Sequence, residues 1–289
     1  VLIGGGLGSF PHGAKPLTDF ISEENLLRMC EAIVQVFDKY GDKKNRNKAR
    51  FKYVLDKLGL KKIKELYEEE FAALANQTFP PIEIPKQEFI PQKLEFKINN
   101  EFNSDLEFQT WKNRNTCEQR QSGYFNVQIK LALGDITSDK ARTVAKMASN
   151  LGGGIIVNTV NQNMMIPWVK NNALSTFYAE LQKVGLHKAG TEEIRDITCC
   201  PGSETCNLGI TASRGLVEHL NEEMENGFPH SKELDHISIK ASGCPNSCGQ
   251  HHIASIGFHG GAKKLNGGLS LHYELLVRGR IYEDKVSFD

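Results

Sequence analysis

The sequence contains two cysteine pairs in glycine- and proline-rich surroundings, TCCPGSETC at residues 198–206 and SGCPNSCGQ at residues 242–250. Five residues separate Cys200 from Cys206, and three separate Cys244 from Cys248. Four thiolates arranged two and two can hold a 4Fe–4S cluster. A structural zinc also accepts four thiolates, but zinc pairs usually have about two to four residues between the cysteines. The spacing therefore favours an iron–sulfur cluster and leaves zinc open.

Three further cysteines lack this setting. Cys30 lies in a helical pattern of apolar residues, and Cys117 and Cys199 have no partner at a regular spacing. A free cysteine commonly packs as a small hydrophobic residue, so these three are predicted to be packing residues. A disulfide framework is not expected, because a chain of 289 residues with 39% apolar residues can build a core without covalent crosslinks.

The second pair carries a resemblance to a known family. Cys-x5-Cys followed at a distance by Gly-Cys-Pro-Asn-Ser-Cys-Gly-Gln resembles the siroheme-dependent sulfite and nitrite reductases. The resemblance implies that Cys200, Cys206, Cys244 and Cys248 hold a 4Fe–4S cluster. It also implies that the sulfur of Cys248 links the cluster to the siroheme iron. The cofactors expected on this basis are a 4Fe–4S cluster and siroheme.

The bulk composition is that of a globular protein. The chain is 24% charged, with 35 Lys and Arg against 35 Asp and Glu, so its formal net charge is zero. No basic field suggests nucleic acid as a partner, and no apolar run reaches the length of a membrane-spanning helix. No secretory signal opens the chain. Because no disulfides are expected among the seven cysteines, we predict a cytoplasmic protein without a membrane or nucleic-acid partner.

The first eight residues, Val1-Leu-Ile-Gly-Gly-Gly-Leu-Gly8, predict a strand that runs into a glycine turn. They do not complete the Gly-x-Gly-x-x-Gly pattern of a dinucleotide site, so a tight turn close to a cofactor is the favoured interpretation. The segment is similar to one near the end of the first half of the family proteins. We therefore expect further chain before Val1, carrying the cations that bind substrate. On this view residues 1–289 hold no catalytic residue and do not turn over substrate alone.

The following region predicts helices and then a linker. One helix begins at the N-cap Ser22 and ends at Gly41. The basic run at residues 43–50 is interpreted as the solvated start of a helix, with contact to siroheme carboxylates or to an acidic electron donor as the alternative. A further helix is expected over about residues 60–75. Four prolines between residues 78 and 92 predict a linker between domains.

A compact unit is predicted over residues 121–185 from the order of its elements. Strands are expected at 125–133, 155–160 and 163–169, and helices at 137–151 and 171–184. This β-α-β-β-α order predicts a ferredoxin-like split βαβ sandwich. The family that the chain resembles contains such half-domains.

One segment of this unit is also similar to the family. Thr159-Val-Asn-Gln-Asn163 matches it, and the resemblance implies that Thr159, Gln162 and Asn163 contact siroheme. Hydrogen bonding within an edge strand and a turn is the alternative interpretation. Val157 stands where many members carry an arginine, so this chain lacks that charged contact with a cofactor carboxylate.

The cysteine region predicts alternating strands and one helix. Strands are expected at 194–198, 236–240 and 253–258, and a helix at 207–225. The resemblance implies that the Asn246 amide faces siroheme, and Gly249 permits a close backbone approach. His251 and His252 are interpreted as polar loop residues and not as iron ligands.

Together these elements predict an α+β protein. It contains a ferredoxin-like split βαβ half-domain and a mixed α/β domain; the resemblance implies that the latter binds siroheme and the 4Fe–4S cluster, and that the part before them is a helical remnant of the first siroheme-family repeat. The expected boundaries are 1–76 for the remnant, 77–110 for the linker, 111–190 for the half-domain and 191–289 for the cofactor domain. The C-terminal end of the last domain is expected to be truncated.

The function implied by the resemblance is the six-electron reduction of sulfite to sulfide, with reduction of nitrite to ammonia as the alternative. The segment HHIASIGFHG at residues 251–260 and the basic run at residues 43–50 favour sulfite, since both are more similar to bacterial assimilatory sulfite reductases than to plant nitrite reductases. Ferredoxin or a flavoprotein is the expected electron donor, because the sequence shows no flavin or nicotinamide site. Two other classes stay open, a non-catalytic iron–sulfur electron carrier and a zinc-stabilised structural domain.

Overall fold

The computed structural model describes residues 1–83, 105–227, 234, 236–281 and 286–287. The chain divides into two compact units, Val1–Gln87 with Ile281–Phe288, and Glu88–Arg280. Much of the predicted proline-rich linker falls on residues 84–104, outside the described residues. Its role as a domain linker stays a prediction, as do the bounds of the four predicted segments.

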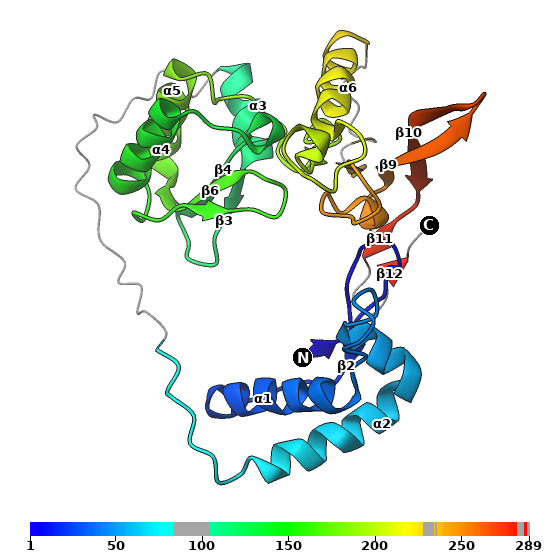
Figure 1. The fold of residues 1–289 in the computed structure, drawn as a ribbon. Helices are drawn as coiled ribbons and strands as arrows, with labels where there is room; N and C mark the ends of the chain where they lie inside the picture. The colour runs from blue at the N-terminus through cyan, green and yellow to red at the C-terminus, as the bar shows by residue number, and fades with distance from the viewer. Residues whose placement is uncertain (84–104, 228–233, 235, 282–285, 288–289) are drawn as a thin grey trace. The chain divides into compact units, whose positions relative to one another are not determined.

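Figure 1 shows the helices and strands in chain order. The helices are α1 (Glu23–Tyr40), α2 (Phe51–Ala73), α3 (Leu106–Asn115), α4 (Ser138–Leu151), α5 (Leu174–Lys183) and α6 (Ser213–Gly227). The strands are β1 (Leu2–Ile3), β2 (Lys15–Pro16), β3 (Thr116–Glu118), β4 (Tyr124–Ile129), β5 (Val157–Asn158), β6 (Met164–Lys170), β7 (Thr198–Cys199), β8 (Ile239–Ser242), β9 (Ile256–Leu265), β10 (Gly268–Val277), β11 (Arg280–Ile281) and β12 (Val286–Ser287). Helices and sheets both contribute, which confirms the predicted α+β class.

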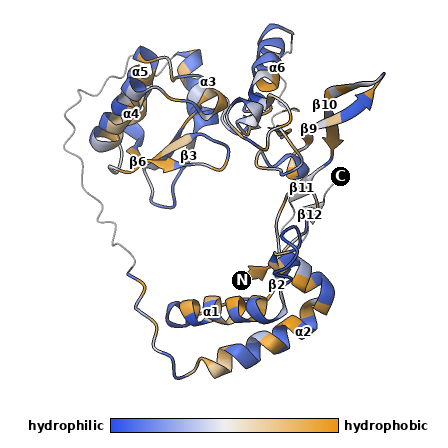
Figure 2. Cartoon of the chain, viewed as in Figure 1, coloured by the Kyte–Doolittle hydropathy of each residue, from blue (hydrophilic) through white to orange (hydrophobic). Residues whose placement is uncertain are grey.

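In the first unit, α1 packs against α2. Helix α1 begins after Ser22 and ends at Gly41, as predicted. Hydrophobic and hydrophilic residues alternate along α1 with helical spacing (Figure 2), and Val36 on its inner face joins the core that Val54 of α2 completes. The long helix α2 is interrupted at Gly59, whose φ of +78° lies outside the helical range. Among the described residues, none of the helices combines the length and apolarity needed to cross a bilayer.

The basic run at residues 43–50 is largely exposed, as predicted, but only its last residue, Arg50, belongs to a helix start, as the N-cap of α2. The carboxylate of Asp42 accepts hydrogen bonds from the backbone N–H groups of Lys44 (3.1 Å) and Asn45 (3.0 Å). A local turn of this kind competes with helical hydrogen bonding. The chain therefore turns through this exposed segment, and α2 begins only at Phe51.

The ferredoxin-like half-domain has the predicted split βαβ arrangement. Its sheet has the order β3-β4-β6-β5, and every neighbouring pair is antiparallel. Because β4 and β5 are both antiparallel to β6, they run parallel to each other with α4 between them in the chain. Thr137 caps α4 by accepting the N–H of Lys140. Trp111, Ile166 and Phe177 lie in the core between the sheet and its helices.

The cysteine-bearing part has its own sheet, in the order β10-β9-β8-β7. Strands β7, β8 and β9 are parallel, and β10 closes an antiparallel hairpin with β9. Helix α6 contributes Val217 to a core shared with Ile239 and Ala241 of β8. The sequence predicts a helix from residue 207, but α6 begins at Ser213. Residues 206–212 instead form a loop held by hydrogen bonds to Gly243.

The three cysteines predicted to be packing residues have different surroundings. Cys199 is only 2% exposed and lies in the core, which confirms its prediction. Cys30 and Cys117 are exposed, so their predictions are wrong. In α1 the neighbouring Met29 takes the inward position, and a helix turns the next residue about 100° away from it. Cys117 lies on β3 at the edge of its sheet, where one face meets solvent.

Candidate metal centre

The two cysteine pairs leave the same edge of one sheet. Strands β7 and β8 are adjacent and parallel, so their carboxyl ends lie together. Cys200 directly follows β7, and Cys206 lies in the loop beyond it. Cys244 and Cys248 lie in the loop that follows β8. The parallel strand pair therefore brings together two cysteine pairs that are separated by 37 residues of chain.

Glycines allow the two loops to touch backbone to backbone. The carbonyl oxygen of Gly243 accepts hydrogen bonds from the N–H groups of Ile210 (2.8 Å) and Thr211 (3.0 Å). A Cβ atom on Gly243 would lie 2.6 Å from the Cα of Gly202. A larger residue at either position would push the loops apart, and with them the cysteine pairs.

The thiols of Cys200, Cys206 and Cys244 lie close enough to affect the ionisation of Cys248. Although the Cys248 residue is exposed, its pKa is raised first by partial desolvation of the thiol within the loop and then by the thiols of Cys200, Cys244 and Cys206. Cys244 is buried, Cys200 is half-buried, and Cys206 and Cys248 are exposed. Thiolates gathered in this way repel one another, and the positive charge of a bound metal centre removes that penalty. The residues present therefore fit a centre with four thiolate ligands.

The thiols do not form a site for a single ion. In the part of the chain that the structure describes, no three His, Cys, Asp or Glu side chains could hold one metal ion. A tetrahedral zinc with bonds of about 2.3 Å brings its sulfur ligands to about 3.8 Å from one another. A cluster of several iron and sulfide ions fills a larger space between its four cysteines. The described side chains are thus not arranged as a ready-made site for one ion.

The sulfur of Cys200 has one backbone donor and a hydroxyl beside it, and that hydroxyl donates to the Cys200 carbonyl. The sulfur accepts a hydrogen bond from the N–H of Gly243 at 3.1 Å and lies 3.5 Å from the hydroxyl of Ser213. Ser213 is fully buried and is the first residue of α6, so the positive end of the helix dipole lies at this loop. Backbone donors and a helix N-terminus both stabilise negative charge on a sulfur ligand.

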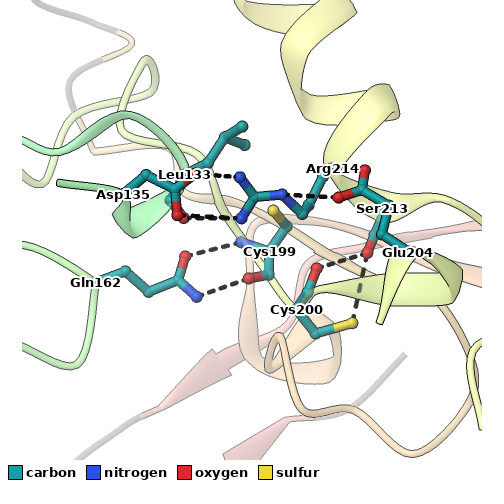
Figure 3. A network of polar contacts seen from close by, with 8 residues as sticks. All are labelled: Leu133, Asp135, Gln162, Cys199, Cys200, Glu204, Ser213 and Arg214. Atoms are coloured by element: carbon teal, nitrogen blue, oxygen red, sulfur yellow. Dashed lines mark hydrogen bonds and ion pairs between the residues drawn. The ribbon is translucent and has the colours of Figure 1, made fainter. Parts of the chain in front are cut away.

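Cys199, which precedes this ligand candidate, is tied to the half-domain by Gln162 (Figure 3). The N–H of Cys199 donates to Gln162 Oε1 (3.1 Å), and its carbonyl accepts from Gln162 Nε2 (2.6 Å). Burial raises the pKa of the Cys199 thiol to about 11, so this thiol stays protonated. Beside it, Arg214 pairs with Asp135 and, at 3.1 Å, with Glu204. The half-domain and the cysteine loops are thus joined at the site itself.

The half-domain residues predicted to contact siroheme bind protein groups in this structure. Thr159 Oγ1 accepts the backbone N–H of Asn163 at 3.1 Å. Asn163 is 1% exposed; its amide oxygen accepts the N–H of Leu131 (2.9 Å) and its amide nitrogen donates to Asp196 (2.6 Å). Gln162 binds the cysteine strand. These contacts support the turn and edge-strand interpretation, and the contact of the three residues with siroheme stays a prediction.

Three other positions bear on the predicted cofactor face. Asn246 is exposed in the loop between Cys244 and Cys248, and Val157 is 40% exposed on β5. Gly249 lies directly against the carbonyl oxygen of Ala241, and the close backbone approach to a cofactor predicted for it stays a prediction. The contact of Asn246 with siroheme stays a prediction.

His251 is not the polar loop residue that the sequence suggests. It is fully buried, and neither of its ring nitrogens has a hydrogen-bond partner among the described residues. Its ring lies 4.2 Å from that of His252 and 4.8 Å from that of His259, between centroids. Burial, followed by these two histidines, lowers the pKa of His251 to about 3, so its ring is neutral. The burial has no signal in the local sequence, because it results from packing against β8 and β9.

Family models match both parts of this site. The nitrite and sulphite reductase 4Fe-4S domain matches residues 1–74 and 190–281, and the nitrite/sulfite reductase ferredoxin-like half domain matches residues 118–184. The chain belongs to the nitrite and sulfite reductase family. This membership confirms the predicted family and supports the predicted cofactor pair, a 4Fe–4S cluster with siroheme.

The chain is similar to reductases of both kinds. A chloroplastic ferredoxin–nitrite reductase from Betula pendula is 26% identical over 276 residues, which is 94% of this chain and 43% of the relative. A sulfite reductase [ferredoxin] from Mycobacterium tuberculosis is 26% identical over 260 residues, which is 89% of this chain and 43% of the relative. The chain thus spans less than half the length of these curated relatives, both of which are named as oxidoreductases.

A solved structure supports the fold. The structure of Mycobacterium tuberculosis NirA protein superposes with a TM-score of 0.75 and 23% sequence identity. The match covers 99% of this chain and 49% of that chain. The arrangement of a ferredoxin-like half-domain with a cysteine-bearing α/β part is therefore one that occurs in a known protein.

Proposed function

We propose that Cys200, Cys206, Cys244 and Cys248 are the four ligands of a 4Fe–4S cluster. The observation that carries this proposal is the gathering of these four thiols at one edge of the β7–β8 pair, where Cys248 responds to the other three. The donors around Cys200 support it, because they stabilise an anionic cluster. The match to the 4Fe-4S domain family supports it independently.

We further propose that the Cys248 sulfur also reaches the iron of siroheme. Within its loop, Cys244 is buried and Cys248 is exposed, so only the second thiol has an open side for another cofactor. Asn246 is exposed between them and is suited to donate to that cofactor through its amide. When bound, the two cofactors supply the electrons for reduction of a small oxyanion, while the protein provides ligation and burial.

The reaction that we propose is six-electron reduction of sulfite to sulfide, with nitrite reduction to ammonia as the alternative. The support for sulfite is the resemblance of residues 251–260 to bacterial assimilatory sulfite reductases. The relatives do not separate the two anions, since a nitrite reductase and a sulfite reductase are equally similar at 26% identity. Steady-state assays with each anion, using the same reduced donor, decide between them.

Ferredoxin is the electron donor that we propose, and a flavoprotein is the alternative. Both of the relatives described above carry ferredoxin in their names. We also propose a cytoplasmic location, because cysteines that serve as thiols or metal ligands suit a reducing compartment. A ferredoxin-dependent rate that saturates with donor, measured against a flavoprotein donor, tests this assignment.

The cofactor assignment is tested by an absorption spectrum of the full-length polypeptide, purified without oxygen from cells that make siroheme. We expect a Soret band, a long-wavelength chlorin-type band, and iron with acid-labile sulfide. A brown shoulder without those bands would indicate an electron carrier, and a colourless protein with one zinc would indicate a structural domain. The Cys248→Ser variant should lose the coupling between siroheme and cluster; unchanged coupling would contradict the bridging role.

A further inference from the structure

The edge of the cysteine sheet is capped by a side chain from the half-domain. Strand β7 is the last strand in the order β10-β9-β8-β7, so one side of it has no strand partner among the described residues. On that side lie the N–H and C=O of Cys199. The Gln162 amide binds both groups, as a backbone amide of a further strand would (Figure 3).

This cap fixes the peptide group that leads to Cys200. Its carbonyl, from Cys199, accepts from Gln162 Nε2 at 2.6 Å. Its N–H, from Cys200, donates to the carbonyl of Ala241 on β8 at 3.2 Å. Both polar groups of the peptide are therefore held, one by the half-domain and one by the sheet. The Cα of Cys200 is placed by this peptide, and with it the sulfur that Gly243 binds.

Gln162 is itself held rigidly. Its backbone has φ of +64°, a left-handed conformation that strains a residue other than glycine. The backbone N–H of Gln162 donates to the carbonyl of Thr159 (3.2 Å), and the next residue, Asn163, is anchored on Asp196. The turn therefore fixes the backbone of Gln162, and the two bonds to Cys199 orient its amide. A glycine would adopt this backbone without strain, but it has no amide to bind Cys199.

We propose that Gln162 is a positioning residue for the cluster ligand Cys200, through which the half-domain controls retention and reduction potential of the cluster. This inference rests on the proposed cluster. Hydrogen bonds to the sulfurs of a cluster stabilise its reduced, more negative state. If the peptide before Cys200 is released, the bond from Gly243 to the Cys200 sulfur weakens, and the potential should fall.

The competing explanation is that Gln162 only joins two parts of the fold. The ion pair between Asp135 and Arg214 offers a matched control, because it also joins the half-domain to the cysteine-bearing part. It does so through groups that do not bind the Cys199–Cys200 peptide. If Gln162 only joins the two parts, iron release and the midpoint potential should change alike in Asp135→Asn and Gln162→Leu. If Gln162 positions the ligand, they should change only in Gln162→Leu.

The test compares these two variants with the parent, each as the full-length polypeptide purified without oxygen. We measure the rate of iron release to a chelator and the midpoint potential of the cluster by EPR-monitored titration. For Gln162→Leu we expect release at least fivefold faster and a reduction equilibrium up to tenfold less favourable, equal to about 59 mV for one electron. For Asp135→Asn we expect changes below twofold.

Equal behaviour of the two variants would overturn the positioning role. If Gln162→Leu does not fold, Gln162→Glu replaces it, since a carboxylate still accepts the Cys199 N–H but has no donor for the Cys199 carbonyl; it should change both quantities in the same direction. A parent protein without a cluster would overturn the proposed function instead. A parent with a cluster that is insensitive to both Gln162 variants would overturn only this inference.

Discussion

The hydroxyl of Ser213 lies 2.7 Å from the carbonyl oxygen of Cys200 and 3.5 Å from its sulfur. One buried side chain at the start of α6 therefore contacts both the backbone and the thiol of a proposed cluster ligand. The hydroxyl has one proton, which it can donate either to the carbonyl or to a thiolate. Donation to the thiolate stabilises the negative charge on the sulfur.

Ser213→Ala should lower the potential of the cluster and destabilise the fold. The variant leaves the Cys200 carbonyl without its side-chain donor, which costs about 1–3 kcal/mol for a buried group. The measurements are an EPR-monitored redox titration and urea unfolding. Ser203→Ala is the control, because Ser203 is exposed in the same loop region. An unchanged potential would show that the hydroxyl serves only the carbonyl.

Cys206→Ser should remove the cluster, while Cys117→Ser should leave it intact. Both thiols are exposed, so accessibility does not distinguish them. Cys206 belongs to the group of four around Cys248, and Cys117 lies on β3 of the half-domain. Iron and acid-labile sulfide per chain are the measurement. Full iron content in Cys206→Ser would contradict the proposed ligand set.

Gly249→Ala should prevent the ligand loop from closing. A methyl group at this position would overlap the carbonyl oxygen of Ala241 on β8. Since neither atom belongs to a flexible side chain, the loop that carries Cys248 must shift, and we expect iron content to fall severalfold together with stability.

Gly215→Ala is the matched control for that substitution. Gly215 lies within α6, and nothing surrounds a Cβ atom built there within 4 Å. Alanine at an exposed helix position stabilises by about 0.5–1 kcal/mol relative to glycine. Urea unfolding and iron analysis of both variants test the pair, and a fully loaded Gly249→Ala protein would show that the loop tolerates the shift.

His251 should make the fold sensitive to acid. Its pKa is about 3 in the folded protein because it is buried, with His252 and His259 beside it, and about 6.5 when unfolded. The unfolded chain therefore binds the additional proton between these values. The contribution of the neutral ring to the free energy of unfolding is fully present above pH 6.5. It is lost as the pH falls towards 3, at about 1.4 kcal/mol per pH unit.

His251→Phe should flatten this dependence, because phenylalanine keeps a ring but does not titrate. Urea unfolding between pH 7 and pH 4.5 gives the slope. His219→Gln is the control, since His219 is exposed on α6 and should leave the slope unchanged. An equally steep slope in His251→Phe would mean that other groups cause the acid sensitivity.

Local sequence was enough to predict several features of this protein. The start of α1 after Ser22, the start of α4 after Thr137 and the split βαβ order of elements follow from local sequence patterns, and the structure agrees with each. The ligand candidates were also evident, because the spacings Cys-x5-Cys and Cys-x3-Cys place the two cysteines of each pair in one short loop. Hydrophobic periodicity and residue spacing predict local structure, because they follow from the geometry of helices and strands.

Other features were decided only by the tertiary structure. The parallel pairing of β7 with β8 joins the two cysteine pairs, and no local pattern specifies that pairing. The late start of α6 at Ser213 follows from hydrogen bonds to Gly243, which lies far along the chain. The bonds of Gln162 to Cys199 and the burial of His251 likewise join distant segments. Sequence determined which residues can act as ligands, whereas long-range packing decided what surrounds them, because burial and hydrogen-bond partners exist only once the chain has folded.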